Sequence, residues 1–505
     1  MARELDDKAT GISSSADEAH IENALGSNAI TSDHEAYILQ RHGTLDLIPM
    51  PSSDPADPLN WPSWKKNLNL ALIAFHGLMS TGCAVAVVPA FQTFSRLYHT
   101  TLTNASYLGS AQLITLALGP ILWVPIANRY GRRPIWLISV IGAGLFNMGC
   151  ALSQSYGANM ACRVMSAFFI SPGIAMGQAV VAETFFAHQR ASKMGIWALA
   201  ITLGPPMGPF AAGFIIQHLG WRWMYWVMAI LNLGQFVTYL FFGPETLYHR
   251  ASIVVRFPAD SSVLYRQYLR IGRIMPAPLG IKDFVLPFVL LGDPRVLLTV
   301  ISYSIVFNFV LVLLTVEIPV YFGVLFHLNP QQIGINFLGL LIGCVLGELI
   351  GGPLSDFWRN QWIRRTGGKA FAPEQRLWLA YLGYPLSIAG VVIFCVTLAE
   401  AKPLHWIITP IVGIAVAGFG TQIITTIVVT YCSDCHPEIK SSAIGVSINF
   451  VRCTWGFLGP FWFPHMFGTL GLRRAAALVS CLMIFASLLI VYIHWKYTRM
   501  GAAKS

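Results

Sequence analysis

Twelve apolar stretches of about twenty residues follow one another along most of the sequence. An α-helix rises about 1.5 Å per residue, so a stretch of this length crosses the hydrocarbon core of a bilayer, which is roughly 30 Å thick. The pattern therefore predicts an all-α membrane protein with twelve transmembrane helices. The expected spans, numbered 1 to 12, are 68–90, 106–127, 135–153, 159–182, 195–216, 223–243, 297–322, 333–352, 378–398, 405–430, 444–467 and 475–495.

The composition excludes a soluble globular protein. Hydrophobic residues make up 55% of the chain and charged residues only 11%, whereas soluble domains carry about 25% charged residues. The net charge of +10 is uneven: residues 1–60 hold 11 acidic and 3 basic side chains, so the rest carries about +18. Most of these cations lie in short loops between spans, which is typical of cytosolic loops rather than of a nucleic-acid-binding face.

The loops also predict the orientation of the chain. The loops after spans 2, 4, 8 and 10 hold 11 arginines and lysines, and the alternate loops hold 5. The positive-inside rule then places both termini in the cytosol. The sequon that begins at Asn104 falls in the first external loop, so Asn104 is a candidate for N-glycosylation. We expect a multi-pass protein of the plasma membrane, with the vacuolar membrane as the alternative.

These features divide the chain into five parts. Residues 1–60 are rich in Ser, Ala, Asp and Glu, which predicts a disordered cytosolic tail that reaches about Asp57. Residues 61–243 and 294–497 predict two six-helix bundles. A polar cytosolic loop over 244–293 separates the bundles, and a second short tail covers 498–505. The nine cysteines form no complete set of metal ligands, so neither a metal nor a cofactor is expected.

An internal repeat relates the two bundles. Glu183 at the end of span 4 matches Asp434 at the end of span 10 at an offset of 251 residues, and the Gly-Pro pair at Gly208 matches the one at Gly459 at the same offset. Between spans 2 and 3, the basic stretch NRYGRRP begins at Asn128, and its counterpart after span 8 contains Asp356. Six-helix repeats of this kind rock about a central site near the bilayer midplane.

At these residues the chain resembles the major facilitator superfamily, over about residues 60–497. The stretch PIANRYGRRPIWL is similar to the loop signature of that family, although Asn128 stands where an Asp is usual. The resemblance implies the major facilitator fold and a gating role for the matched positions. These positions are Asn128, Arg129, Gly131, Arg132, Arg133, Glu183, Gly352, Asp356 and Asp434.

Span 5 carries a second signature. The stretch TLGPPMGPFAAG resembles the antiporter motif of exporters in this superfamily, and strings such as FGPETLY resemble the fungal drug:proton antiporter branch. The matched motif positions are Gly204, Gly208, Pro209 and Gly213. The resemblance implies close packing between spans 5 and 8 that closes one end of a cavity, while packing common to any helix bundle is the equal alternative. Span 8 offers Gly339, Gly343 and Gly347 for this contact.

Ionisable side chains inside spans indicate function, because each costs about 2.5 to 3.5 kcal/mol at a helix centre on insertion scales. Arg163 resembles the membrane-embedded arginine of the span 4 signature and is a candidate for proton coupling, with a structural pairing to backbone carbonyls as the alternative. Glu317 and Glu348 are the carboxyl candidates, although Glu317 can instead gate or be solvated and Glu348 can belong to the cytosolic charge network. His76 and Arg452 complete the set of intramembrane ionisable residues.

Cavity-facing positions of spans 1, 4, 7 and 10 are the candidates for substrate contact. Aromatic and Met side chains with a few amides suit amphipathic compounds of varied shape. The candidates are Met79, Gln178, Tyr303, Phe307, Asn308, Gln422 and Thr426. Because predicted boundaries shift by two to four residues, about half of these positions should miss the cavity.

The leading hypothesis is a proton-coupled exporter of small amphipathic molecules, such as drugs, toxins or fungal secondary metabolites. A nutrient importer on the same fold and a non-transporting sensor are the alternatives. An enzyme is not expected, because no nucleophile and base, phosphate loop or metal constellation stands out. The expected partners are a small-molecule substrate and the lipid bilayer, without nucleic acid, and the expected state is a monomer driven by a proton gradient.

Asn128 is the anomaly in the loop signature. An amide accepts hydrogen bonds from helix-end N–H groups but cannot form an ion pair. Its counterpart Asp356 keeps the carboxylate. We therefore expect an asymmetric gate that depends more on Asp356 than on Asn128.

Overall fold

The fold is known from a computed structural model that describes residues 32–45, 47–248, 263–270, 272–275, 278–365, 373–436 and 441–502. Within these residues, eleven helical stretches are long and apolar enough to cross a membrane. The prediction of an all-α membrane protein is confirmed. The last stretch contains both expected spans 11 and 12, which meet at a kink at Gly471, so the count of eleven includes all twelve expected spans.

Spans 1 to 6 form the N-terminal bundle. Span 4 consists of two helices that meet at Ser171 and Pro172, because proline has no N–H to continue the hydrogen-bond ladder. The helices are α4 (Ser63–Val85), α5 (Phe91–Leu97), α6 (Leu102–Tyr130), α7 (Arg132–Leu152), α8 (Tyr156–Ile170), α9 (Pro172–Thr184), α10 (Ala187–Leu219) and α11 (Trp221–Phe242).

Spans 7 to 12 form the C-terminal bundle. Span 7 is irregular, since two π-helical segments, η5 (Asn308–Val312) and η6 (Ile318–Phe322), flank its short helix α14 (Leu313–Glu317). The other elements are α13 (Pro294–Phe307), α15 (Gly323–Leu325), α16 (Pro330–Arg365), η7 (Pro373–Leu379), α17 (Ala380–Glu400), α18 (Thr409–Cys435) and α19 (Ser441–Ala502). Helix α19 turns from span 11 to span 12 at Gly471, whose φ of 72° is a conformation that glycine adopts readily.

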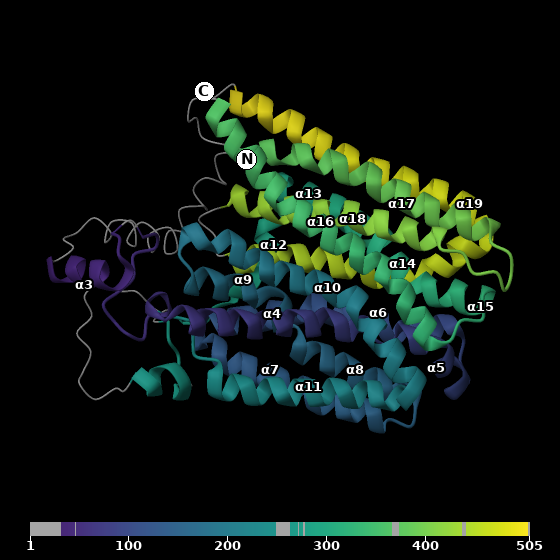
Figure 1. The fold of residues 1–505 in the computed structure, drawn as a ribbon, viewed down its shortest axis with the longest axis horizontal. Coiled ribbons are helices and arrows are strands. Elements are labelled where there is room, and N and C mark those ends of the chain that lie inside the picture. Colours follow the sequence, from purple (N-terminus) through teal and green to yellow (C-terminus); the bar gives the residue numbers. More distant parts are fainter. Residues whose placement is uncertain are drawn as a thin grey trace.

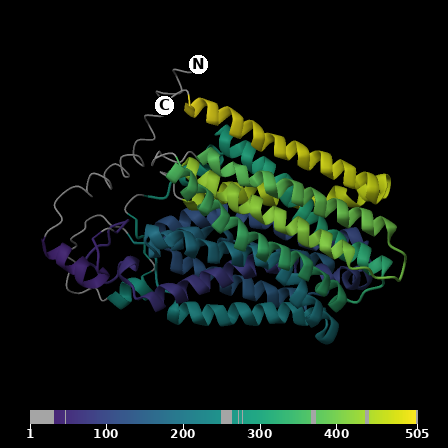
Figure 2. The same ribbon diagram turned by 45° about the horizontal axis from the view of Figure 1, so that its top comes forward.

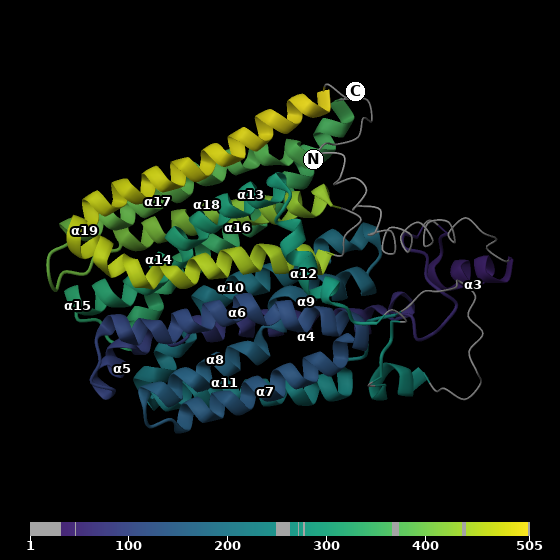
Figure 3. The same ribbon diagram turned by 180° about the vertical axis from the view of Figure 1, so that it is seen from behind.

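The two bundles lie side by side along their length. Figure 1 shows the purple-to-teal helices of the first bundle below the green-to-yellow helices of the second, and the view from behind shows the same division (Figure 3). Helix α10 packs on α16, and α6 packs on α19, so spans 5, 8, 2 and 11 form the seam between the bundles. Span 12 lies at the outer edge of the second bundle (Figure 2).

The two ends of the molecule differ. At one end lie the N-terminal helix α3 (Ser32–His42), the segment 263–275 and helix α12 (Ile281–Leu290), and we call this the linker end. The opposite end carries α5 and α15 and is called the far end. The basic loop between α6 and α7 reaches the linker end, because Arg129 forms an ion pair with Asp283 of α12 at 2.9 Å.

The N-terminal tail departs from the expectation of disorder over its described part. Residues 32–42 form helix α3, and Ile38, Leu47 and Leu59 pack against Phe186 in a small apolar cluster. Buried Asp54 accepts hydrogen bonds from Arg266 at 2.7 and 3.1 Å, which ties the tail to the central segment. A few apolar residues are enough to order a polar stretch when a neighbouring surface buries them. Composition alone does not reveal that such a surface is present.

The central segment, expected as a polar loop over 244–293, contains structure as well. Helix α12 packs on α6 and α19, and Ser447 of α19 donates a hydrogen bond to the carbonyl of Pro287 at 2.7 Å. The central segment therefore contacts both bundles at the linker end. Residues 249–262, 1–31 and 503–505 of the predicted loop and tails lie outside the described residues.

Candidate functional site

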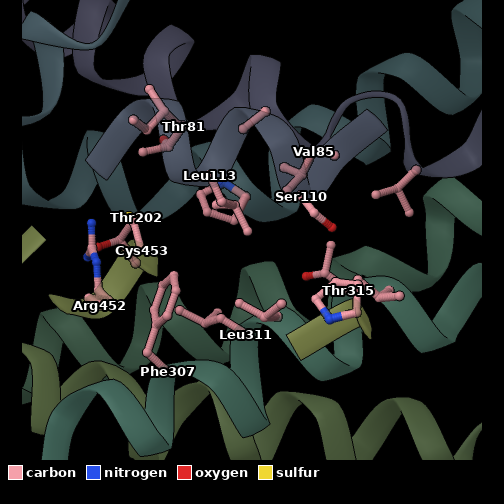
Figure 4. Close-up of a pocket in the computed structure, with 18 of the residues that line it drawn as sticks. Thr81, Val85, Ser110, Leu113, Thr202, Phe307, Leu311, Thr315, Arg452 and Cys453 are labelled. Atoms are coloured by element: carbon pink, nitrogen blue, oxygen red, sulfur yellow. The ribbon is translucent and has the colours of Figure 1, made fainter. Parts of the chain in front are cut away.

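A central cavity of about 80 Å³ lies at the seam between the bundles. Its wall comes from spans 1, 2, 4 and 5 of the first bundle and from spans 7, 10 and 11 of the second. Most of the wall is apolar, as Val85, Leu113 and Leu311 illustrate in Figure 4. The polar groups that interrupt it are Thr81, Ser106, Ser110, Thr202, Tyr303, Thr315, Gln422, Thr425 and Arg452.

Three of the seven candidates for substrate contact line this cavity. These are Tyr303, Phe307 and Gln422. Met79 instead packs in the apolar cluster around Ile174. Gln178 lies against Gly445 of the other bundle, and Asn308 lies against Gly459. A side chain turns by about 100° per residue along a helix, so an error of one position in phase moves a residue from the cavity into the bundle.

The hydroxyl groups of the cavity were missed. Thr81, Ser110, Thr202 and Thr315 line it, although none was a candidate. Thr426, which was a candidate, instead donates a hydrogen bond to Glu348 at 2.9 Å. Threonine and serine occur on every face of these helices, so the sequence contains no signal that separates the cavity-facing ones from the rest.

Arg163 lies in the interior of the first bundle, where it is 1% exposed. Its guanidinium donates hydrogen bonds to the carbonyls of Leu108 at 2.8 Å and Ala84 at 3.0 Å, and to Oε1 of Gln112 at 2.7 Å. Tyr225 accepts a fourth bond at 3.4 Å. All four of these acceptors are neutral, which is the structural pairing that was the alternative for this residue.

The two carboxyl candidates have different surroundings. Glu317 ends α14, is 2% exposed, and its Oε1 has no hydrogen-bond partner among the described residues. Glu348 of α16 accepts hydrogen bonds from Nε2 of Gln422 at 2.5 Å and from Thr426. Glu348 is therefore engaged with span 10 inside the second bundle. Glu317 follows the cavity residues Thr315 and Val316 in the sequence but does not itself line the cavity.

An ion pair at the linker end joins two of the predicted gating residues. Arg132 begins α7 and donates from Nη2 to Glu183, at the end of α9, at 2.9 Å. Arg132 is 2% exposed, and Glu183 also accepts a hydrogen bond from Thr246 at 2.9 Å. The pair fastens the start of span 3 to the end of span 4.

A residue that the sequence reasoning missed completes this pair. Glu245, just after α11, accepts hydrogen bonds from the backbone N–H of Arg132 at 2.8 Å and of Arg133 at 2.9 Å. Its carboxylate lies at the N-terminus of α7, where the helix dipole favours negative charge. Burial raises the pKa of Glu245, and the N–H groups of Arg132, Leu247 and Arg133 oppose that rise.

Glu245 also explains how an amide can stand at Asn128 in place of the usual carboxylate. Oδ1 of Asn128 is buried without a hydrogen-bond partner among the described residues, so the amide does not accept from a helix end there. The carboxylate at the start of α7 comes from Glu245 instead. The string FGPETLY contains Glu245, but only the fold brings the end of span 6 to the start of span 3.

The second bundle has an equivalent ion pair. Arg376 in η7, before span 9, donates from Nε to Asp434, at the end of span 10, at 2.6 Å, and also donates to Ser355 at 3.0 Å. Arg376 was not a candidate. Asp356 lies within α16, but its side chain is outside the described part of the structure, and the predicted gate residue Gly352 has open space around it.

The antiporter-motif glycines occupy close helix contacts. Gly204 and Gly208 lie against the backbone of Gly82 in span 1, and Gly213 lies against Pro330 and Gly334 of span 8 at the far end. Span 5 does pack on span 8, but not through the small residues expected in span 8. Gly339, Gly343 and Gly347 face Ile411, Ala415 and Phe419 of α18, because they lie on a different face of α16 from Gly334.

Residues 70–460 match the Major Facilitator Superfamily. The chain belongs to this family. It is therefore a membrane transporter rather than an enzyme. The chain is 28% identical to the MFS transporter cpaT of Aspergillus oryzae, over 89% of this chain and 91% of that protein.

Other similar proteins carry names that refer to efflux. The chain is 27% identical to the multidrug transporter TPO1_2 of Candida glabrata, over 86% of this chain and 74% of that protein. It is also 27% identical to the efflux pump radE of Floropilus chiversii, over 85% and 80% of the two chains. The chain is thus related to fungal efflux pumps and multidrug transporters.

A solved structure supports the fold. The crystal structure of a bacterial homologue of the human lysosomal transporter Spinster, in an inward-facing and unoccupied conformation, superposes with a TM-score of 0.59. The match covers 87% of this chain and 99% of that chain at 13% identity, which shows the fold alone.

Proposed function

We propose that this protein exports small amphipathic molecules across the plasma membrane of a fungal cell by alternating access, driven by protons that move inward. The observation that carries the proposal is the central cavity, which lies between two six-helix bundles and has a mostly apolar wall with scattered hydroxyl groups. Such a wall binds apolar bodies of varied shape while a few polar groups orient them. Export, rather than import, is favoured by the names of the related efflux pumps.

Contacts join the two bundles toward both ends of the molecule. At the far end, Gly213 lies against Gly334, and the rings of Tyr107 and Phe461 stack 4.5 Å apart. At the linker end, Gln178 lies against Gly445. Alternating access requires that each set of contacts separates in turn while the other set holds.

Glu317 is the proposed proton carrier. Glu317 directly follows the cavity residues Thr315 and Val316 in span 7, and its Oε1 has no hydrogen-bond partner among the described residues, so it is not committed to a structural ion pair there. Arg163, which donates hydrogen bonds to neutral acceptors, and Glu348, which accepts hydrogen bonds from span 10, serve to hold their helices in place. Loss of the Glu317 carboxyl should uncouple substrate movement from protons.

The test uses proteoliposomes that contain the purified protein and a panel of fluorescent amphipathic dyes of positive, zero and negative charge. At least one dye should move against its own gradient while a pH gradient is imposed, and a protonophore should stop that movement. The Glu317→Gln variant should still let the dye equilibrate but should not concentrate it. Glu400→Gln, at an exposed position of the far end, is the matched control.

Other outcomes would contradict parts of the proposal. Dye movement that persists without a proton gradient would overturn proton coupling. Accumulation of a labelled sugar or amino acid in expressing cells would favour the nutrient importer. Dye binding without movement in either direction would favour a non-transporting sensor. A fluorescent fusion that labels the vacuolar membrane would overturn the plasma-membrane location.

A further inference from the structure

Arg452 of α19 is the one arginine, lysine or acid among the described residues that line the central cavity. Figure 4 shows its side chain at one end of the cavity, on the same side as Phe307 and Cys453. A guanidinium stays protonated in proteins, so the cavity carries a fixed positive charge. The sequence showed an ionisable residue in span 11, but not that it faces the cavity.

The groups that hold Arg452 are neutral. Its Nη1 donates to the hydroxyl of Tyr303 at 3.1 Å, and its Nη2 donates to Oδ1 of Asn449 at 2.9 Å. The guanidinium carbon also lies 4.9 Å from the centre of the Phe307 ring. These contacts fix the orientation of the guanidinium without neutralising its charge.

One donor of Arg452 has no hydrogen-bond acceptor. Its Nε is buried and makes no hydrogen bond within the described residues. Arg452 forms no ion pair with an acid among the described residues, and Glu348 instead accepts hydrogen bonds from Gln422 and Thr426. A charge that is removed from water without a counterion is unfavourable. An anion in the cavity would relieve this cost.

We propose that Arg452 binds the anionic group of the transported molecule, so that the cargo is an amphipathic organic anion such as a carboxylate or a sulfonate. Arginine suits this task because its planar donors match the oxygens of these groups. The apolar body of the cargo lies along Leu113, Phe307 and Leu311, and the threonine and serine hydroxyls satisfy its remaining polar groups. This substrate class rests on the proposed function as a transporter with a central site.

Three probes with the same ring and different charges test the proposal: 1-naphthoate, 1-naphthylmethanol and 1-naphthylmethylammonium. Equilibrium binding of each is measured with the full-length protein in nanodiscs at pH 7.5. Charge-assisted hydrogen bonds contribute enough to predict that the naphthoate binds at least about tenfold more tightly than the ammonium compound. The alcohol should fall between them.

Variants assign that preference to one residue. Arg452→Gln should weaken naphthoate binding about tenfold and leave binding of the alcohol unchanged, since only the anion uses the charge. Arg452→Lys should keep part of the preference. Arg474→Gln removes a positive charge from an exposed position of the same helix and should bind all three probes as the wild type does. The comparison of the three probes on the wild-type protein stands even if a variant fails to fold.

The outcomes separate this proposal from the one on which it rests. Equal binding of the three probes, preference for the ammonium compound, or binding of none overturns the assignment of an anion site. Transport of a cationic dye without any preference for anions would overturn it as well while leaving the exporter intact. Selective naphthoate binding that depends on Arg452, without transport, would support the anion site and overturn the exporter.

Discussion

The linker ends of the two bundles carry the same ion pair in different surroundings. In the first bundle Arg132 and Glu183 are 2% and 20% exposed at their side chains, and Glu245 accepts from the backbone at the start of α7. In the second bundle Arg376 and Asp434 are 8% and 36% exposed, and Arg376 also donates to the hydroxyl of Ser355. An ion pair can therefore be repeated in both bundles while the groups that support it come from different parts of the chain.

The largest expected effect comes from replacing Glu245, which supports the start of α7 in the first bundle. Glu245→Ala leaves the N–H groups of Arg132 and Arg133 buried without their acceptor, at a cost of about 1 to 3 kcal/mol for each. The variant should lose most dye transport and unfold at a clearly lower temperature in detergent. Glu245→Gln, which keeps an acceptor oxygen, should lose less. Wild-type unfolding and transport in Glu245→Ala would show that the cap has no role.

A smaller difference should appear in double-mutant cycles of the two ion pairs. The coupling energy between Arg132 and Glu183 should exceed that between Arg376 and Asp434, because water screens a more exposed pair more strongly. We expect about 1 to 2 kcal/mol for the first pair and less than about 1 kcal/mol for the second. Thermal or urea unfolding of the single and double alanine variants measures both cycles. A larger coupling in the second bundle would reverse the comparison.

The smallest expected effect concerns Asn128. Because Glu245 already supplies the carboxylate at the start of α7, Asn128→Asp should change dye transport by no more than about threefold, or roughly 0.7 kcal/mol. Asp356→Asn should lower the transport rate more, since Asp356 is the carboxylate that the second repeat has at the position equivalent to Asn128. Initial transport rates in proteoliposomes decide between them. An equal loss in the two variants would contradict the asymmetric gate.

Some of the fold and of the gate could be predicted from the sequence. Long apolar stretches fix a membrane helix by themselves, so all the spans were found, including the two that Gly471 separates within α19. Glu183 and Asp434 were identified because the internal repeat aligns them at one offset. Arg376, the partner of Asp434, was seen only as a loop cation, since the loop that holds it differs in length between the two halves.

Other features depend on which face of a helix meets which neighbour. Gly339, Gly343 and Gly347 show the spacing expected of a close helix contact, yet they face span 10 rather than span 5. Met79 and Gln178 lie on spans that do line the cavity, but their side chains point elsewhere. The spacing of small residues predicts a close contact without naming the partner, because several helices surround each span.

The sequence by itself determined the membrane class, the number of spans, the repeat and the family. Each of these follows from local hydropathy or from motifs that are contiguous in the sequence. Only the tertiary structure decided that Glu245 supplies the carboxylate that Asn128 lacks, and that Arg452 faces the cavity without a counterion from the described part of the chain. Both depend on contacts between residues that are far apart in the sequence or on the rotation of a helix about its axis. Each of the three arginines of NRYGRRP thus donates a hydrogen bond, from its side chain or its backbone, to an acid far away along the chain, at separations of 154 residues for Arg129, 51 for Arg132 and 112 for Arg133.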